Sequence, residues 1–241
     1  TACSETVKFG HVIFFWNGNR SGYFDQNLEK YEEIPSDAGI PFNVQPKMKA
    51  LEIAQKARDA ILSQKFDQVR VNIANGDMVG HTGDMEATIV GCKAADEAVK
   101  VHVHGLVRQA LRCDHLSIFP RVFPSYRLIQ SVSCRSSSTP LSKWAGVFVV
   151  TADHGNAEDM AKRDESGEPL RDKDGKVQTL TSHTLNPVPI ALGGPGLAPG
   201  VRFRTDLASA GLANVAATVM NLHGFEAPDH YEPTLIQVVD E

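Results

Sequence analysis

Long hydrophobic runs are missing from this chain of 241 residues. No apolar stretch approaches the roughly 20 residues that a helix needs to cross a bilayer, and the first six residues lack the basic and apolar regions of a secretory signal. Cysteine is also scarce, and its four positions show neither CxxC spacing nor a disulfide framework. We therefore expect a soluble protein of the cytoplasm, with free thiols and no membrane partner.

An initiator methionine is absent as well, and the first methionine is Met48. Removal of a methionine that preceded Thr1 would explain this absence. A chain that begins partway through a longer protein would explain it equally well, and both explanations stay open.

Acidic residues are nearly absent from residues 101–145. This segment holds six Lys or Arg and one acid, which leaves 18 bases and 28 acids elsewhere in a chain of net charge −5. It also holds eight serines and shows no sustained period of 2 or 3.6 residues. It separates a predicted helix, Ala87–Lys100, from a predicted buried strand, Gly146–Thr151. Such connections usually take about 2–6 residues.

Three interpretations of residues 101–145 compete. Nucleic-acid binding would need dense basic clusters interleaved with aromatic residues, which are missing, so we expect no nucleic-acid partner. A disordered loop insertion stays open. We favour translated non-coding sequence, such as a retained intron or a mispredicted exon, because the composition changes abruptly at both ends of the segment.

Outside that segment, short apolar runs alternate with amphipathic patterns. Strands are predicted at Val12–Trp16, Val69–Ala74, Val147–Thr151 and Val188–Leu192. Helices are predicted at Met48–Leu62, Ala87–Lys100 and 212–222. This alternation predicts an α/β fold, with an open, mostly parallel sheet and helices on both faces.

Five side chains form a candidate metal-ligand set: Asp77, His81, Asp153, His154 and His183. Asp77 and His81 share a face if the chain turns into a helix after Val69–Ala74. Asp153 and His154 follow the strand predicted at Val147–Thr151. Sites in open sheets form at such carboxyl ends. Carboxylates and imidazoles without thiolates suit Mn²⁺ or Zn²⁺ acting on phosphate oxygens. Capping of turns by the aspartates, with exposed histidines, is the alternative explanation.

Several longer motifs run in order along the chain. They are Lys8–Val12, Phe14–Gly22, Ile34–Asp37, Asn75–Asp84, Thr151–Asn156, Ser182–Thr184 and Gly211–Phe225. Through them the chain resembles the C-terminal part of the cofactor-independent (2,3-bisphosphoglycerate-independent) phosphoglycerate mutases, above all the plant forms. The resemblance covers residues 5–100 and 146–239, and it implies an incomplete alkaline phosphatase-like domain over 1–241 that residues 101–145 interrupt.

The resemblance also implies an activity. These enzymes are isomerases that interconvert 3- and 2-phosphoglycerate in glycolysis through a phosphoserine, with two Mn²⁺ ions or similar ions such as Zn²⁺, Co²⁺ or Mg²⁺. By motif, Asp77, His81 and His183 resemble the ligands of one ion, whereas Asp153 and His154 resemble part of the second site. Lys8 resembles the lysine that stabilises charge on the transferring phosphate.

Parts of the family's machinery have no counterpart in this sequence. The nucleophilic serine and the aspartate that shares its metal belong to an N-terminal half that does not match. The substrate-binding domain, which is inserted between the two halves, has no match either. We therefore expect a monomer that is inactive alone, with phosphoglycerate as the substrate of the complete enzyme. A related metal-dependent phosphatase or phosphodiesterase, or a non-catalytic metal-binding fragment, remains an alternative.

Overall fold

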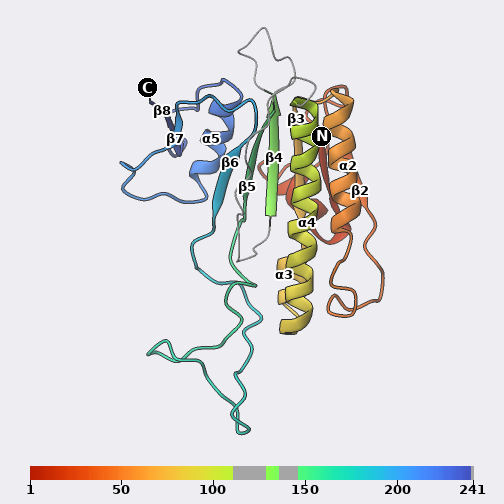
Figure 1. The fold of residues 1–241 in the computed structure, drawn as a ribbon, viewed down its shortest axis with the longest axis vertical. Coiled ribbons are helices and arrows are strands. Elements are labelled where there is room, and N and C mark those ends of the chain that lie inside the picture. The colour runs from red at the N-terminus through yellow and green to blue at the C-terminus, as the bar shows by residue number, and fades with distance from the viewer. Residues whose placement is uncertain (111–128, 136–145, 240–241) are drawn as a thin grey trace.

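The computed structural model describes residues 1–110, 129–135 and 146–239 (Figure 1). Within these ranges the chain forms a six-stranded sheet in the order β2-β1-β3-β4-β5-β6 and a two-stranded sheet of β7 and β8. The strands are β1 (Ala2–Glu5), β2 (Tyr31–Ile34), β3 (Gln68–Ile73), β4 (Ile129–Arg135), β5 (Gly146–Thr151), β6 (Ile190–Gly193), β7 (Val201–Phe203) and β8 (Ile236–Val238). The helices are α1 (Thr6–Gly10), the π-helix η1 (His11–Phe15), α2 (Ala50–Ser63), α3 (Asn75–Gly80), α4 (Met85–Ala110) and α5 (Asn214–Leu222).

The large sheet is mixed in its pairing but has a prevailing direction. Strand β1 pairs in parallel with β2 and with β3. Strand β4 is antiparallel to both β3 and β5, and β6 is antiparallel to β5. Of the six described strands, β1, β2, β3 and β5 therefore run the same way. The predicted α/β class is confirmed.

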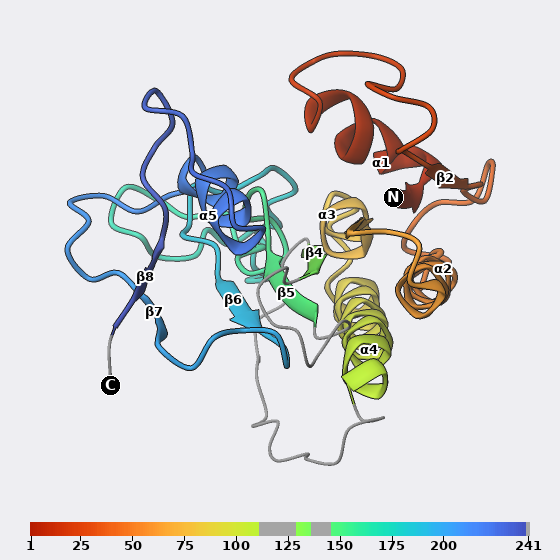
Figure 2. The ribbon, with the colours of Figure 1, turned by 90° about the horizontal axis from the view of Figure 1, so that it is seen from above.

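Helices cover both faces of the sheet, as Figure 2 shows: α2 and α4 lie on one side, and η1 and α5 lie on the other. Alternate side chains of β3 explain the division, since Val69 and Val71 pack in the core with α2 and α4. Arg70 points the opposite way and places its guanidinium 4.7 Å from the ring of Trp16, which directly follows η1. On that face, Val149 of β5 packs against Val219 of α5.

One predicted strand is wrong. Residues 12–15 of this run lie in η1, which continues α1 without a break, and Trp16 follows it; Val12 is buried whereas Phe15 is 57% exposed. A short apolar run cannot by itself distinguish a strand from a helix. The strand predicted at Val188–Leu192 begins two residues later, as β6. Strands β1 and β2 were not predicted, since they are four residues each and carry polar residues.

The structure gives part of residues 101–145 a regular backbone. Helix α4 continues past Lys100 to Ala110, with His102 and Val103 buried. Strand β4 lies between β3 and β5. The remaining stretches, 111–128 and 136–145, lie outside the described residues, so the predicted disorder or mis-splicing of the whole segment stays a prediction.

The central place of β4 can be tested with proline. Val132 pairs with Arg70 on one side and with Val149 on the other. Val132→Pro removes a ladder donor in a strand with neighbours on both sides, so we expect a loss of about 3 kcal/mol in the free energy of unfolding, measured in urea. Val132→Ala keeps the N–H group and serves as the control. Equal stability of the two variants would contradict the pairing.

His102 in α4 gives a pH-dependent stability. Burial lowers the pKa of His102 from 6.5 to about 4, and neither ring nitrogen has a hydrogen-bond partner among the described residues. In the unfolded chain His102 therefore takes up a proton near pH 6.5, whereas in the folded chain it stays neutral down to about pH 4. The free energy of unfolding falls as the pH drops from about 6.5 toward 4. His102→Leu removes this loss, so we expect it to raise the free energy of unfolding by about 3 kcal/mol at pH 4 through this effect. At pH 7.5, where His102 is neutral in both states, the effect should be absent. His230→Gln, at an exposed histidine, is the control in urea unfolding at both pH values.

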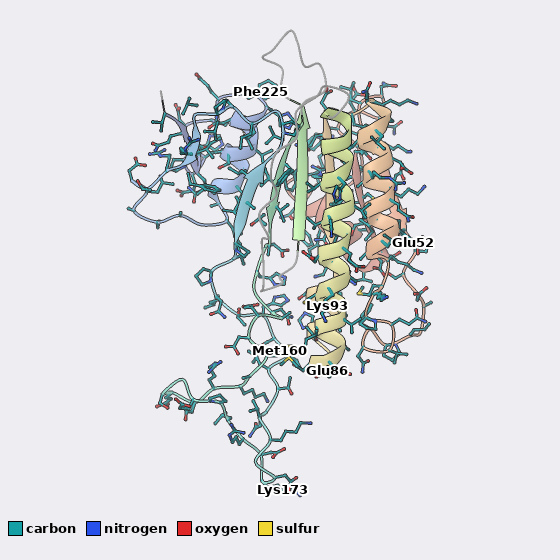
Figure 3. The ribbon with its side chains drawn as sticks, viewed as in Figure 1. Glu52, Glu86, Lys93, Met160, Lys173 and Phe225 are labelled. Atoms are coloured by element: carbon teal, nitrogen blue, oxygen red, sulfur yellow. The ribbon has the colours of Figure 1, made fainter. Side chains whose placement is uncertain are left out.

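After β5 the chain forms a long extension and returns to the sheet at β6. Figure 3 marks the buried Met160 near its base and Lys173 at its tip. Antiparallel bridges such as Ala161 with Thr179 and Arg171 with Val177 hold its two arms together. The returning arm brings His183 back beside the sheet. No described helix is both long and apolar enough to cross a membrane.

Candidate metal centre

The first two ligand candidates belong to the helical turn that follows β3: Asp77 lies in α3, and His81 caps its C-terminal end. The helical turn joins them, because the amide of His81 donates to the carbonyl of Asp77 at 2.9 Å. Asp77 is 1% exposed. A side chain at Gly80 would place Cβ 2.2 Å from Asn156 Oδ1, so it would displace the Asn156 side chain that contacts Asp77. The chain thus turns from strand to helix here, which is the condition for Asp77 and His81 to share a face.

The other candidates lie on two loops that hydrogen bonds tie together. The loop after β5 carries Asp153 and His154, and the extension carries His183. The amide of Thr184 donates to the carbonyl of Gly155 at 2.9 Å. The Glu158 carboxylate accepts a hydrogen bond from the Asn156 amide at 2.6 Å and another from the Thr184 hydroxyl. These contacts hold His183 beside His154.

The side chains converge on one oxygen of Asp77. Its Oδ1 lies 3.1 Å from Nε2 of His81, 3.1 Å from Nε2 of His183 and 3.9 Å from Nε2 of His154. The Nε2 atoms of His81 and His183 are 3.1 Å apart. Four ligands bound to one ion at about 2.1 Å lie about 3.4 Å from one another. The cluster therefore has the dimensions of a single coordination sphere.

Backbone contacts orient the imidazoles toward this point. Nδ1 of His81 lies 2.6 Å from the carbonyl of Thr181, a partner that assigns the proton to Nδ1 and leaves the Nε2 lone pair facing Asp77. Nδ1 of His154 lies 3.3 Å from the carbonyl of Gly155. The rings of His154 and His183 stack at 3.6 Å between centroids. The two Nδ1 contacts are of the kind that metal-bound histidines usually make with their second ring nitrogen.

Asp77 is kept ionised by its neighbours. Burial alone would raise the pKa of Asp77, but the hydrogen bond and charge of Lys8, aided by His81 and His154, lower it. Lys8 Nζ lies 2.8 Å from Asp77 Oδ2. Asn156 Nδ2 donates to Asp77 Oδ1 at 3.1 Å. A carboxylate held in its charged form is the form that binds a cation.

Asp153 lies beside this cluster and outside its shortest contacts. Its Oδ1 is 3.6 Å from Nε2 of His154. This oxygen is buried and has no hydrogen-bond partner among the residues that the structure describes. A buried carboxylate oxygen without a donor is what a bound cation would satisfy. His154 thus lies between the Asp77 cluster and Asp153, within reach of either.

The structure adds residues that the sequence did not single out. Asn156 contacts Asp77, and Glu158 ties the two ligand loops together. His11, which the pattern gave no role, lies 3.5 Å from the ammonium of Lys8. The spacing of three residues between Lys8 and His11 could have indicated this, had a helix been predicted there.

Known proteins match this chain over nearly its whole length. The model of the metalloenzyme superfamily matches residues 1–112 and 140–227. The chain is 65% identical over 239 residues to a 2,3-bisphosphoglycerate-independent phosphoglycerate mutase of Ricinus communis, covering 99% of this chain and 37% of that protein. The corresponding protein 1 of Arabidopsis thaliana is also 65% identical, with the same coverage.

A solved structure agrees. The phosphoglycerate mutase of Leishmania mexicana, determined at low cobalt concentration, is 47% identical and superposes with a TM-score of 0.81 over 99% of this chain and 37% of its own. The chain thus spans little more than a third of the length of the relatives it matches. The matching family model, which leaves out only 113–139 and the C-terminal residues, shows that the chain belongs to the metalloenzyme superfamily.

Proposed function

We propose that this chain is the metal-binding part of a 2,3-bisphosphoglycerate-independent phosphoglycerate mutase, the isomerase that interconverts 3- and 2-phosphoglycerate in glycolysis. The observation that carries the proposal is the convergence of three imidazoles on Asp77 Oδ1, with Lys8 on the other carboxylate oxygen. The similarity to the plant and Leishmania mutases supports the choice of reaction.

The residues have distinct tasks in this proposal. Asp77, His81 and His183 hold one divalent ion, and Asp153 and His154 supply part of a second site. Bound ions of this kind polarise phosphoryl oxygens and lower the pKa of an attacking hydroxyl. Lys8 carries the positive charge that offsets negative charge on the transferring phosphoryl group. Since no serine of this chain stands in a nucleophile motif, the remainder of the enzyme must supply it, and this chain alone does not transfer phosphate.

The preferred ion is Mn²⁺, with two ions in the complete enzyme. The donor set of carboxylates and imidazoles also admits Zn²⁺, Co²⁺ or Mg²⁺, and the relative from Leishmania mexicana was studied with cobalt. Phosphoglycerate is the substrate, no nucleic acid or membrane takes part, and the protein is a monomer of the cytoplasm. Gel filtration with light scattering and cell fractionation test the last two points.

A chimera provides the test of function. This chain, with and without residues 101–145, would replace the matching third of the Ricinus communis relative. With Mn²⁺ we expect at least one chimera to convert 3-phosphoglycerate into 2-phosphoglycerate, and its Lys8→Met form to lose this activity. A chimera that folds and binds Mn²⁺ but only releases phosphate from esters would favour a phosphatase or phosphodiesterase. One that binds Mn²⁺ and turns over neither substrate would indicate a non-catalytic metal-binding protein.

We also propose that residues 101–145, which contain the last turns of α4 and strand β4, are translated non-coding sequence. The family model leaves out residues 113–139, which lie inside this segment. Sequencing transcripts across both ends of the segment tests the proposal. A spliced form that lacks it would support the proposal, whereas its presence in every mature transcript would exclude it.

A further inference from the structure

His11 faces the metal centre without belonging to the ligand cluster. It opens η1, one helical turn after Lys8, and it is half-buried. Its Nε2 atom lies 3.5 Å from Nζ of Lys8. The electrostatic influences on His11 come from Lys8, Asp153, Asp77 and His154, all of them residues of the proposed centre. Nothing in the proposed reaction yet uses this side chain.

Lys8 needs more than one acceptor at its position. Its side chain is 9% exposed, so water has little access, and an ammonium has three donors. One donor meets Asp77 Oδ2 at 2.8 Å. His11 Nε2 is the second group within reach. With these two partners among the described residues, one donor of Lys8 is left for an incoming phosphoryl oxygen.

The surroundings of His11 favour the form that accepts a hydrogen bond. Its ring contacts Phe15 edge to face, with 5.2 Å between centroids. Burial first, and the positive charge of Lys8 second, lower the pKa of His11, against the opposing influence of Asp153 and Asp77. A neutral imidazole has a free lone pair on one nitrogen, and Nε2 is the nitrogen that faces Lys8.

We propose that His11 is a positioning residue, whose Nε2 accepts a hydrogen bond from Lys8 and directs the ammonium toward the phosphoryl group. The proposal deepens the role of Lys8 and rests on the proposed function for its meaning in the reaction. The contact between Lys8 and His11 is present in the chain without a bound phosphoryl group, so it can be tested independently of the reaction.

The first test follows the Lys8 ammonium by nuclear magnetic resonance in the whole chain labelled with ¹⁵N-lysine, with Lys8→Met to assign the signal. We expect His11→Leu to speed hydrogen exchange of this ammonium about fivefold or more, as for one lost hydrogen bond. His11→Gln keeps an acceptor and should restore slow exchange. Unchanged exchange in His11→Leu, or equally fast exchange in both variants, would overturn the proposal. If His11→Leu does not fold, His11→Asn, whose amide is one methylene shorter, takes its place.

The second test measures inorganic phosphate binding to the Mn²⁺-loaded chain by calorimetry. We expect His11→Leu to weaken phosphate binding about fivefold, to leave Mn²⁺ affinity within about twofold, and His11→Gln to recover most of the loss. An equal loss of Mn²⁺ affinity would assign His11 a structural role and contradict the proposal. Absence of Mn²⁺ binding in the unaltered chain would refute the proposed function, while the exchange experiment would still decide the role of His11.

Discussion

Replacement of Lys8 by methionine is expected to destabilise the chain by about 3–5 kcal/mol, because it leaves the carboxylate of Asp77 buried without its cation. The Asp77 side chain is 0% exposed, and Lys8 lies 2.8 Å from it. Methionine conserves most of the apolar volume of lysine, so the change removes charge rather than packing. Urea unfolding at pH 7.5 without metal gives the free energy of unfolding.

A second substitution separates charge from packing in this experiment. In the Lys8→Met, Asp77→Asn chain the buried charge is gone, so we expect most of the lost stability to return. Mn²⁺ should also stabilise Lys8→Met alone, because the ion replaces the missing positive charge. A loss below about 1 kcal/mol in Lys8→Met, a value typical of exposed ion pairs, would contradict the burial of this pair.

The second large effect concerns stabilisation by metal. With free Mn²⁺ at about 100 times its dissociation constant, the folded chain should gain about 2.7 kcal/mol, provided that the unfolded chain does not bind the ion. His81→Ala, His183→Ala removes two of the imidazoles that lie 3.1 Å from Asp77 Oδ1 and should abolish this gain. Urea unfolding with and without Mn²⁺ measures both values.

The control for this experiment is His230→Ala, at an exposed histidine near the C-terminal end. It should keep the full stabilisation by Mn²⁺. If the double variant is stabilised as much as the unaltered chain, the ion binds elsewhere and the centre described here is wrong.

The sequence could predict the relative positions of those metal-ligand candidates that lie close together along the chain. Asp77 and His81 follow a strand rich in β-branched residues, and their spacing of four residues suffices to place both on one helical turn. His183 was different. A long polar extension separates it from β5, and tertiary contacts, such as those of Thr184 with Gly155 and Glu158, bring it to the site.

Two features escaped the sequence for physical reasons. The run His11–Phe15 is apolar enough for a strand, and its helical form depends on the preceding turn of α1 and on packing against β1 and β3. The place of β4 depends on pairing with distant strands, which no local pattern encodes. The contacts of Asn156 and His11 follow from these tertiary arrangements.

The central claim is that this chain by itself assembles a divalent-metal centre around Asp77. The most direct measurement is a Mn²⁺ titration of the metal-free chain, followed by the electron paramagnetic resonance signal of the free ion. We expect the chain to remove about one ion per molecule in a saturable manner, and Asp77→Asn to remove none. A chain that leaves the free-ion signal unchanged, or an Asp77→Asn variant that binds as the unaltered chain does, would contradict the account.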